Sequence, residues 1–386
     1  MLESEMRCER AKKKLRSAAR SERKIKCFVC PDIVCYYDSH VANYPNPLLP
    51  DALSAAKCTH YTYIGIGLHP NGEIRFLNDK FDTDIGFLFF QSLRTAETKL
   101  MILLGGIHES SATFSKVVAN YQDTLINNIA LFLTRYNFDG IDIDWRYPAS
   151  RGGQASDKAN FQKFIIRLRA RLNMINKLLA VSVSPNKSVF SGAYDSTTLS
   201  LYADMINVFA FNFTDVVETT TSNISPLYTD MTSPASVNSS IVDWISTKVR
   251  KSKLNLVVAT YARTYTLARE TRTAVASPIS GLGDAGSNTQ KAGYLAQYEL
   301  CPLKTNYATI ADGGTATVYY TKGSSWISSE TEDTLAQKYS YAVINGLGGV
   351  AIYTLDWDDW TNDCGMGSFP SAALARDYLY SGTNGA

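Results

Sequence analysis

The stretch FDGIDIDWRYP, residues 138–148, gathers four ionisable side chains: Asp139, Asp142, Asp144 and Arg146. Side chains of a β-strand alternate between its two faces, so Asp142, Asp144 and Arg146 share one face and the apolar residues between them share the other. Two carboxylates in a row could serve acid–base chemistry. Burying them without partners would cost several kcal/mol. The stretch therefore indicates either a buried aspartate–arginine ion pair or a catalytic strand.

The segments that must position these residues alternate along the chain between strand-like and helix-like patterns. Apolar residues recur at helical spacing over 125–133, over 161–172 behind the predicted cap Ser156, and over 237–245. This alternation is typical of a parallel sheet covered by helices, and eight strands predict an α/β fold, a TIM-type (β/α)8 barrel. We expect strands at 33–37, 60–68, 99–106, 138–145, 178–185, 205–213, 254–261 and 348–356.

The spacing of the strands is interrupted once. About 85 residues separate the seventh strand from the eighth, far more than a βα unit needs. The stretch 264–328 is rich in Thr, Ser, Gly and Tyr and contains short alternating runs such as TATVYY. We expect an inserted α+β subdomain there, which walls one side of the barrel mouth. The barrel domain is expected over 32–382.

The composition excludes several classes of protein. The chain has 386 residues, of which 45% are hydrophobic and 19% charged, and no apolar run approaches the ~20 residues of a membrane span. Its formal net charge of +2 argues against a general nucleic-acid binder. Residues 1–26 hold ten Lys and Arg against four Glu. We interpret 1–31 as a solvated, disordered tail or a misassigned start, since no secretion signal is visible before Tyr36.

Seven cysteines are present, and three of them, Cys8, Cys27 and Cys30, lie in this N-terminal segment. CFVC, residues 27–30, has the C-x-x-C spacing of metal and redox sites, but a second pair of ligands is missing nearby. We therefore expect no metal and no cofactor. Free or loosely paired thiols are the prediction for this segment.

FDGIDIDWRYP resembles the signature of family 18 glycoside hydrolases, the chitinases and chitinase-like lectins, whose fourth strand carries D-x-x-D-x-D-x-E. Asp139, Asp142 and Asp144 match this signature, and Arg146 stands where the family has its glutamate. Other landmarks of the family occur in order over residues 33–382: CYYDSHVANY, CTHYTYIGIGL, LLGG, SPLY and GGVAIYTLDWDDW. The resemblance implies a barrel that binds or cleaves N-acetylglucosamine polymers at its mouth.

The resemblance also implies two disulfides, Cys35 with Cys58 and Cys301 with Cys364. Because disulfides persist in oxidising compartments, we expect an extracellular protein, although no signal peptide is visible. Four glycosylation sequons are weakly consistent with this location. Asn186 and Asn223 look like exposed loop sites, whereas Asn212 falls in a predicted strand and Asn238 at a helix.

In the family, the glutamate protonates the glycosidic oxygen, and the substrate's own N-acetyl group attacks the anomeric carbon with help from the neighbouring aspartate. A tuned acid has a pKa of about 6 to 7, whereas that of arginine exceeds ~12, so proton donation from Arg146 would be uphill by roughly 7 kcal/mol. Phe211 and Asn212 replace the tyrosine and aspartate that orient the acetamide. Ile107, Gly65 and Tyr353 replace aromatic residues of the sugar-binding floor. The ligand-binding residues that we expect are Tyr36, Tyr147, Phe211, Asn212, Tyr261 and Tyr353.

Three functional hypotheses follow. The favoured one is a catalytically inactive chitinase-like protein, a lectin or signalling factor that binds chitin or related glycans at the barrel mouth and has a possible protein receptor. The second is a hydrolase with a relocated acid, for which Glu109 and Asp215 are candidates near the rim. In the third, Arg146 pairs with Asp142 or Asp144 and closes the cleft, so that the protein acts through its outer surface.

Overall fold

The computed structural model describes residues 30–213 and 218–381. The predicted basic tail therefore lies almost wholly outside the described residues. Within them, eight parallel strands form a barrel that closes through the pairing of β1 with β2. A short antiparallel strand, β3 (Ile74–Phe76), extends β2 beyond the barrel. The barrel strands are β1 (Asp32–Asp38), β2 (His60–Leu68), β4 (Lys99–Gly105), β5 (Gly140–Asp144), β6 (Leu178–Val183), β7 (Met205–Val208), β8 (Leu254–Ala259) and β15 (Gly349–Tyr353).

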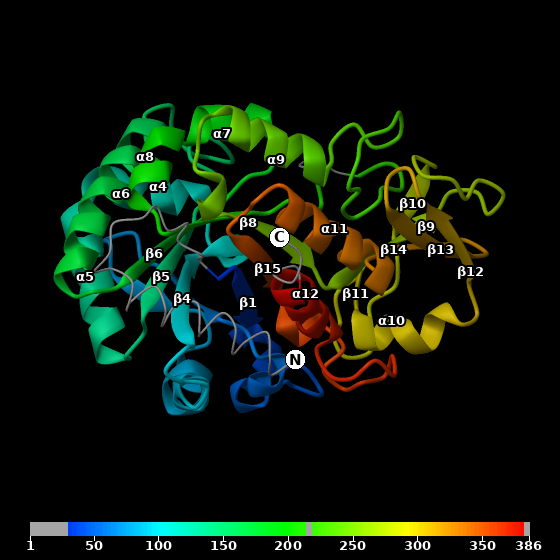
Figure 1. Ribbon diagram of the computed structural model, residues 1–386, viewed down its shortest axis with the longest axis horizontal. Coiled ribbons are helices and arrows are strands. Elements are labelled where there is room, and N and C mark those ends of the chain that lie inside the picture. Colours follow the sequence, from blue (N-terminus) through cyan, green and yellow to red (C-terminus); the bar gives the residue numbers. More distant parts are fainter. Residues whose placement is uncertain (1–29, 214–217, 382–386) are drawn as a thin grey trace, which may run out of the picture.

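Helices cover the outside of this barrel, and the predicted TIM-type fold is confirmed (Figure 1). The three stretches with helical spacing form α5, α6 and α9. Ser156 is at the N-cap position of α6, but its side chain makes no capping hydrogen bond. The helices are α2 (Asp79–Phe81), α3 (Phe87–Gln91), α4 (Ser111–Asn120), α5 (Gln122–Arg135), α6 (Asp157–Met174), α7 (Lys187–Ala193), α8 (Ser196–Tyr202), α9 (Val237–Ser246), α11 (Glu332–Ile344) and α12 (Pro370–Ser381).

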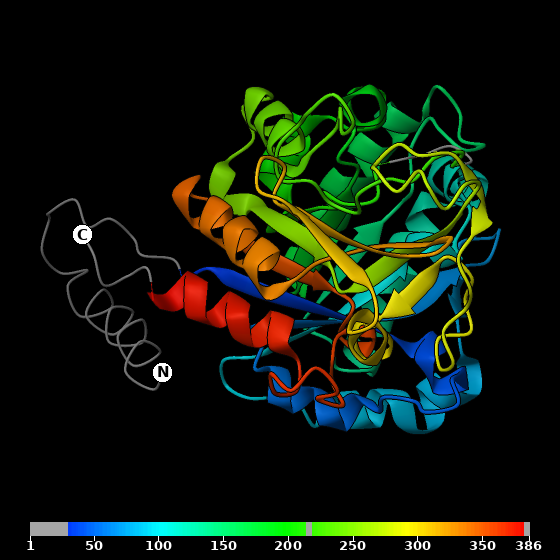
Figure 2. The ribbon, with the colours of Figure 1, turned by 90° about the vertical axis from the view of Figure 1, so that its right-hand side faces the viewer.

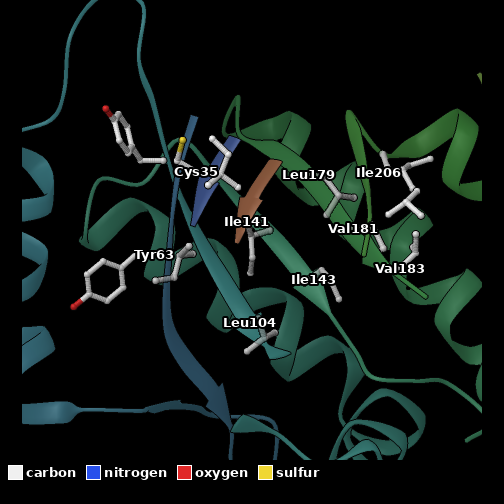
Figure 3. Close-up of a cluster of buried hydrophobic side chains, with 14 of the residues drawn as sticks. Cys35, Tyr63, Leu104, Ile141, Ile143, Leu179, Val181, Val183 and Ile206 are labelled. Atoms are coloured by element: carbon white, nitrogen blue, oxygen red, sulfur yellow. The ribbon is translucent and has the colours of Figure 1, made fainter. Parts of the chain in front are cut away.

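The two faces of each barrel strand contact different layers, as the alternation in β5 predicts. Ile141 and Ile143 point outward and belong to the apolar layer between sheet and helices, beside Leu179 and Val181 of β6 (Figure 3). Inside the barrel, a second apolar cluster contains Met101 and Leu103 of β4 together with residues of six further barrel strands. The polar side chains of β5 share this interior.

The long interval between β8 and β15 contains a second, antiparallel sheet and the helix α10, which stand beside the barrel, followed by the barrel helix α11 (Figures 1 and 2). The predicted α+β insertion is therefore confirmed. Its first strand follows β8 almost without a break, so the insertion begins at the barrel mouth. The elements are β9 (Tyr261–Leu267), β10 (Ile279–Leu282), β11 (Tyr294–Ala296), α10 (Gln297–Lys304), β12 (Ala308–Asp312), β13 (Thr317–Lys322) and β14 (Ser325–Ser329).

All eight predicted strands exist, but several end earlier than the sequence indicated. The clearest case is β7, which was expected to reach residue 213 and ends at Val208. The amides of Ala210 and Phe211 each donate to the carbonyl two residues earlier, and Asn212 has a φ of 47°. The prediction that Asn212 lies in a strand is therefore wrong. This turn directs residues 209–212 across the mouth of the barrel instead of along its wall.

Two disulfides join segments that are distant in sequence. Cys35 of β1 bonds to Cys58, which precedes the amino end of β2, and Cys301 of α10 bonds to Cys364, as the family resemblance implied. Cys30 is also disulfide-bonded, so of the free or loosely paired thiols expected in the N-terminal segment this one is paired.

Candidate functional site

A cleft of about 730 Å³ opens at the carboxyl ends of the barrel strands. The barrel strands contribute their last residues and the residues beyond them, and the insertion adds a wall. Catalytic and binding residues of such barrels lie at this end. The lining residues include Asp38 at the end of β1 and His40 beyond it, Ile107 and His108 after β4, Arg146, Tyr147 and Arg151 after β5, Phe209, Phe211 and Asn212 after β7, Tyr353 at the end of β15 and Trp357 beyond it, and Tyr261, Lys291 and Tyr294 of the insertion.

Below the cleft, Asp142 lies in a closed hydrogen-bond network and is fully buried. Its carboxylate accepts from the Tyr36 hydroxyl at 2.7 Å, from the Ser182 hydroxyl at 2.9 Å and from the Asn207 amide at 3.0 Å. Burial raises its pKa to about 6, and the charge of Asp144 adds to the rise, whereas the three donors oppose it. Asp142 is thus a satisfied interior carboxyl without direct access to a ligand.

One layer higher, Arg146 binds Asp144. Its Nε donates to both oxygens of Asp144 at 3.0 Å, and its Nη2 donates to Oδ2 at 2.7 Å. The side chain of Asp144 is 2% exposed and that of Arg146 14%. The guanidinium carbon lies 4.5 Å from the ring centre of Phe209 and 5.6 Å from that of Tyr353. Burial opposes the charge on Arg146, but the charge of Asp144 and its hydrogen bonds outweigh this and raise the pKa of the guanidinium.

This arrangement bears on the closed-cleft hypothesis. Arg146 pairs with Asp144, one of the two partners considered, and lines the cleft from below. The Arg146 side chain forms the floor of the cleft, and the cleft above it stays open. The predicted interior ion pair is therefore present, but it does not fill the barrel mouth.

Two glycines make room for the pair. Gly105 has a φ of 104°, and a Cβ there would lie 2.5 Å from the carbonyl oxygen of Asp144. At Gly106, with a φ of 71°, a Cβ would lie 3.3 Å from Asp144 Oδ2. Both positions combine a left-handed backbone with close approach to β5, which only glycine permits without strain. The LLGG landmark in the sequence thus shapes the floor of the cleft.

Asp139, although part of the same motif, lies at the opposite end of β5. Arg94 donates from Nη1 to both of its oxygens at 3.0 and 2.8 Å, and the Leu100 amide donates to Oδ2 at 2.8 Å. This end of the barrel is remote from the cleft. Asp139 is therefore a structural residue that ties β5 to β4, and it does not join Asp142 and Asp144 in the site.

The predicted ligand-binding residues divide into two groups. Tyr147, Phe211, Asn212, Tyr261 and Tyr353 all line the cleft. Tyr36 is fully buried beneath Tyr353 and Phe209, at ring-centre distances of 5.4 and 6.0 Å, and its hydroxyl is used by Asp142. Its predicted contact with a ligand is wrong, because the interior network encloses it.

Glu109 also lies away from the cleft. Its Oε2 accepts from the Leu68 amide at 2.7 Å and from Arg75 at 2.9 Å, its Oε1 accepts from the Ser110 amide at 2.9 Å, and its side chain is 5% exposed. These bonds hold the carboxylate among the loops, so its candidacy as a relocated acid is wrong. Asp215, the other candidate, lies outside the described residues.

The sequence reasoning missed a histidine–aspartate pair on the cleft wall. His108 Nε2 lies 2.8 Å from Asp38 Oδ2, and the rings of His108 and His40 are 5.6 Å apart. Asp38 is the last residue of β1 and His108 lies three residues beyond β4, and this position at the end of a strand was the available signal. The wall contributed by Lys291 and Tyr294 had no local signal, because it comes from the insertion through tertiary folding.

The two sequons expected in exposed loops have different surroundings. Asn223 is 8% exposed, so the expectation of an exposed loop site there is wrong. Asn186 is the N-cap residue of α7 and lines the cleft, where its amide donates to the Phe213 carbonyl at 3.3 Å. Asn238 lies in α9, as expected.

Among the described residues, no group of His, Cys, Asp and Glu could hold a metal ion. None of the described helices is long and apolar enough to span a membrane.

The sequence profile of glycosyl hydrolases family 18 matches residues 32–358, which is most of the chain. The chain belongs to this family. It is 28% identical over 358 residues to probable chitinase 10 of Drosophila melanogaster. That alignment covers 88% of this chain and 16% of the Drosophila protein, so the chain spans less than a fifth of that relative.

Solved structures of the family superpose closely. The Group IV chitinase of Ostrinia furnacalis in complex with allosamidin has a TM-score of 0.88 and 26% identity, over 91% of this chain and 99% of that one. YKL-39 in the presence of chito-oligosaccharides has a TM-score of 0.83 and 25% identity, over 90% and 99%. Human YKL-39 is described as a pseudo-chitinase with retained chito-oligosaccharide binding. The family thus contains chitinases and a protein described as a pseudo-chitinase on the same barrel.

Proposed function

We propose that this family 18 protein binds glycans that contain N-acetylglucosamine in the barrel-mouth cleft and does not hydrolyse them. The observation that carries the proposal is the side chain at position 146. A guanidinium that donates three hydrogen bonds to a 2% exposed carboxylate stands where the family resemblance places the proton donor. Arginine stays protonated in proteins and cannot act as an acid near neutral pH.

The carboxylates near Arg146 do not supply a substitute acid. Asp142 is enclosed by three donors and fully buried. Asp144 accepts three hydrogen bonds from Arg146, and its side chain is 2% exposed. Among the described residues that line the cleft, Asp38 is the one carboxylate, and His108 holds it at 2.8 Å. A general acid must reach the proton acceptor directly or through one water, and none of these groups is placed over the floor at position 146.

The group that would position a substrate acetamide is also altered. Phe211 packs against Tyr353 and Tyr261, with ring-centre distances of 5.8 and 5.9 Å, and has no hydroxyl. Asn212 is neutral and has its backbone in the left-handed region. Substrate-assisted hydrolysis needs both an acid and an oriented acetamide, so two independent requirements are missing. The aromatic rings that remain on the cleft wall still offer surface for sugars.

Hydrolysis and binding can be tested separately. Purified protein is incubated with chitotetraose between pH 3 and 9, and products are analysed by mass spectrometry, while affinity is measured by calorimetry. We expect binding without products. Products that appear with the wild-type protein and disappear with Asp142→Asn would overturn the proposal, because a contaminating chitinase would be unaffected by that substitution.

Arg146→Glu provides a further check. We expect it to remain inactive on chitotetraose, because Phe211 and Asn212 still fail to orient the acetamide. Turnover restored by this single change would mean that the rest of the site is intact, and that Arg146 alone accounts for the inactivity. Arg146→Gln serves as the matched control, since glutamine has the size of glutamate and no acid.

The disulfides support an extracellular location as part of the same proposal. Cys35–Cys58 joins β1 to the segment before β2, and Cys301–Cys364 joins α10 of the insertion to the segment after β15. Such bonds persist in oxidising compartments and are rare in reducing ones. Detection of the native protein in the extracellular fraction, with both bonds intact by non-reducing peptide mapping, checks this point. Recovery in a reduced intracellular pool would contradict it.

A further inference from the structure

The Phe, Tyr and Trp rings that line the cleft differ in how much of their surface is accessible. A sugar that stacks on an aromatic side chain needs an accessible ring face, because its apolar C–H groups pack against that face. Five of the lining rings are at most 9% exposed and offer a ligand little surface: Tyr147, Phe209, Phe211, Tyr261 and Tyr353. Three half-buried rings of the described lining are left as stacking surfaces: Tyr44, Tyr294 and Trp357.

Two of these three rings have other contacts that compete with stacking. The guanidinium carbon of Arg263 lies 4.3 Å from the ring centre of Tyr294, and Lys291 Nζ lies 4.5 Å from it. A cation over a ring occupies the face that a neutral sugar would use. The ring of Tyr44 packs against the apolar layer between the barrel and its helices. Trp357 is the remaining ring, and within residues 30–213 and 218–381 no Lys or Arg lies over it.

The backbone around Trp357 is fixed by its neighbours in the chain. Trp357 ends the short 3-10 helix η6 (Leu355–Trp357), and its amide donates to the Thr354 carbonyl at 3.1 Å. Asp356 Oδ1 accepts from the Asp38 amide at 3.0 Å, which ties the segment to the end of β1. The residues on either side of Trp357 are fully buried, whereas Trp357 itself is partly exposed. A large aromatic residue is therefore presented to the cleft by an otherwise enclosed segment.

The ring of Trp357 is fixed by the insertion. Its centre lies 5.6 Å from that of Tyr261 and 6.0 Å from that of Tyr294, with interplanar angles of 76° and 82°. The ring also packs against the apolar cluster inside the barrel. A binding surface that is already ordered loses little conformational entropy when a ligand binds, and rigid aromatic side chains are effective for this reason.

Because the Trp357 ring is accessible, not covered by a cation and fixed in place, we infer that a sugar ring of the bound glycan stacks on Trp357. This inference rests on the proposed function, because it names the specificity-determining contact of the same cleft. A pyranose with equatorial substituents, such as N-acetylglucosamine, presents a flat C–H face that matches an indole. Ile107 and Gly65 add no ring to the floor of the cleft, and Tyr353 is 8% exposed. The wall at Trp357 therefore supplies the stacking surface that the floor lacks.

Substitutions at Trp357 test the inference with chitotetraose as the probe and calorimetry as the measurement. Trp357→Ala should weaken binding about tenfold, because the ring face is lost. Trp357→Phe should stay within about threefold of the wild type, because a phenyl ring keeps a stacking surface. Its retained affinity also shows that the position tolerates substitution without loss of the fold.

Trp360 is a matched control for Trp357. It lies three residues further along, is also half-buried and also contacts a tyrosine edge-on, Tyr298 at 6.0 Å, but it is outside the cleft lining. Trp360→Ala should bind chitotetraose within about twofold of the wild type.

Tryptophan fluorescence provides a second readout, because the other three tryptophans are at most 1% exposed: Trp145, Trp244 and Trp326. We expect the emission of the wild type and of Trp360→Phe to change when chitotetraose binds. Trp357→Phe should bind the probe with no such change. A merely structural role of Trp357 would not remove the signal from a variant that still binds.

The outcomes separate this inference from the proposed function. An affinity of Trp357→Ala within twofold of the wild type would overturn the inference and leave glycan binding standing. The same follows if Trp360→Ala weakens binding as much as Trp357→Ala does, or if Tyr44→Ala weakens it more. Absence of binding by the wild-type protein would overturn both proposals.

Discussion

Strand β5 carries an arginine–aspartate pair at each of its ends. At the amino end, Arg94 Nη1 donates to Asp139 at 3.0 and 2.8 Å. At the carboxyl end, Arg146 donates to Asp144 at 3.0, 3.0 and 2.7 Å. The exposed fractions of the arginine and aspartate side chains are 31% and 21% in the first pair, and 14% and 2% in the second. The hydrogen-bond distances of the two pairs are similar. The pairs differ in how deeply they are buried and in which residues surround them.

The neighbours explain what each pair does. Arg94 also donates to the Asn137 carbonyl, and Asp139 accepts from the Leu100 amide. The pair at the amino end therefore connects the backbone before β5 to that of β4. Arg146 instead lies over Phe209 and faces the cleft. The Arg94–Asp139 pair therefore stabilises the amino end of the barrel strands. The Arg146–Asp144 pair forms part of the floor of the cleft at their carboxyl ends.

The largest expected effect tests this difference in burial. Arg146→Met should lower the free energy of unfolding by about 3 to 5 kcal/mol at pH 7, because Asp144 is left charged and nearly fully buried. Arg94→Met should lower it by only about 1 kcal/mol, because water can reach the side chain of Asp139, which is 21% exposed. Urea denaturation followed by tryptophan fluorescence measures both values.

Acidification sharpens that result. Without Arg146, burial should raise the pKa of Asp144, so that the folded state takes up a proton as the pH falls. The loss of unfolding free energy caused by Arg146→Met, relative to the wild type, should therefore be smaller at pH 5 than at pH 7. For the control Arg94→Met, this loss should change less with pH. Equal losses of stability in the two variants at pH 7 would mean that burial does not separate the two ends.

A second effect concerns the carboxyl end in the wild-type protein. Burial raises the pKa of Asp142 to about 6, that of Asp358 to about 7 and that of Asp356 to about 8. A carboxyl with a raised folded-state pKa stabilises the fold below its unfolded pKa of about 4, and this contribution is lost as the pH rises through the folded value. We expect the free energy of unfolding, measured by urea denaturation, to fall as the pH rises from 5 to 8.

Asp356→Asn identifies the main source of this loss. Asp356 is fully buried, its Oδ1 accepts from the Asp38 amide at 3.0 Å, and its Oδ2 has no hydrogen-bond partner among the described residues. Asparagine keeps the acceptor and cannot ionise. The variant should lose less stability than the wild type between pH 6 and 8. If the free energy of unfolding of the variant changed with pH as much as that of the wild type, groups other than Asp356 would cause the pH dependence.

The sequence predicted the barrel well, because its signals are local and repeated. Apolar runs set the eight strands, and the period of two in β5 correctly placed Asp142, Asp144 and Arg146 inside. The exact ends of the strands were not predicted. Residues 209–212 are apolar enough to continue β7, but the turn at Phe211 and Asn212 depends on packing against Tyr353 and Tyr261 in the assembled mouth.

The site was predicted only in part for the same reason. Residues at the end of a strand or shortly beyond it, such as Tyr353 and Tyr147, could be assigned to the mouth. Tyr36 and Glu109 were assigned wrongly, because the networks that enclose them involve partners 106 and 41 residues away in sequence. Lys291 comes from the insertion, and no pattern in the sequence indicates that its position faces the barrel.

The smallest expected effect is on ligand affinity when Asp139 is changed. We expect almost none, because Asp139 lies at the end of β5 that is remote from the cleft. Asp139 belongs to the family motif as much as Asp144 does, yet it contacts Arg94 and the Leu100 amide and lies outside the lining of the cleft. Asp139→Asn should cost about 1 kcal/mol of stability and leave the affinity for chitotetraose, measured by calorimetry, within twofold of the wild type. Asp144→Asn is the matched change at the other end, and it should alter affinity, because it releases the Arg146 guanidinium that forms the floor. If Asp139→Asn weakened binding as much as Asp144→Asn, the two ends would be coupled through the strand, and the assignment of structural and binding roles to separate ends of β5 would fail.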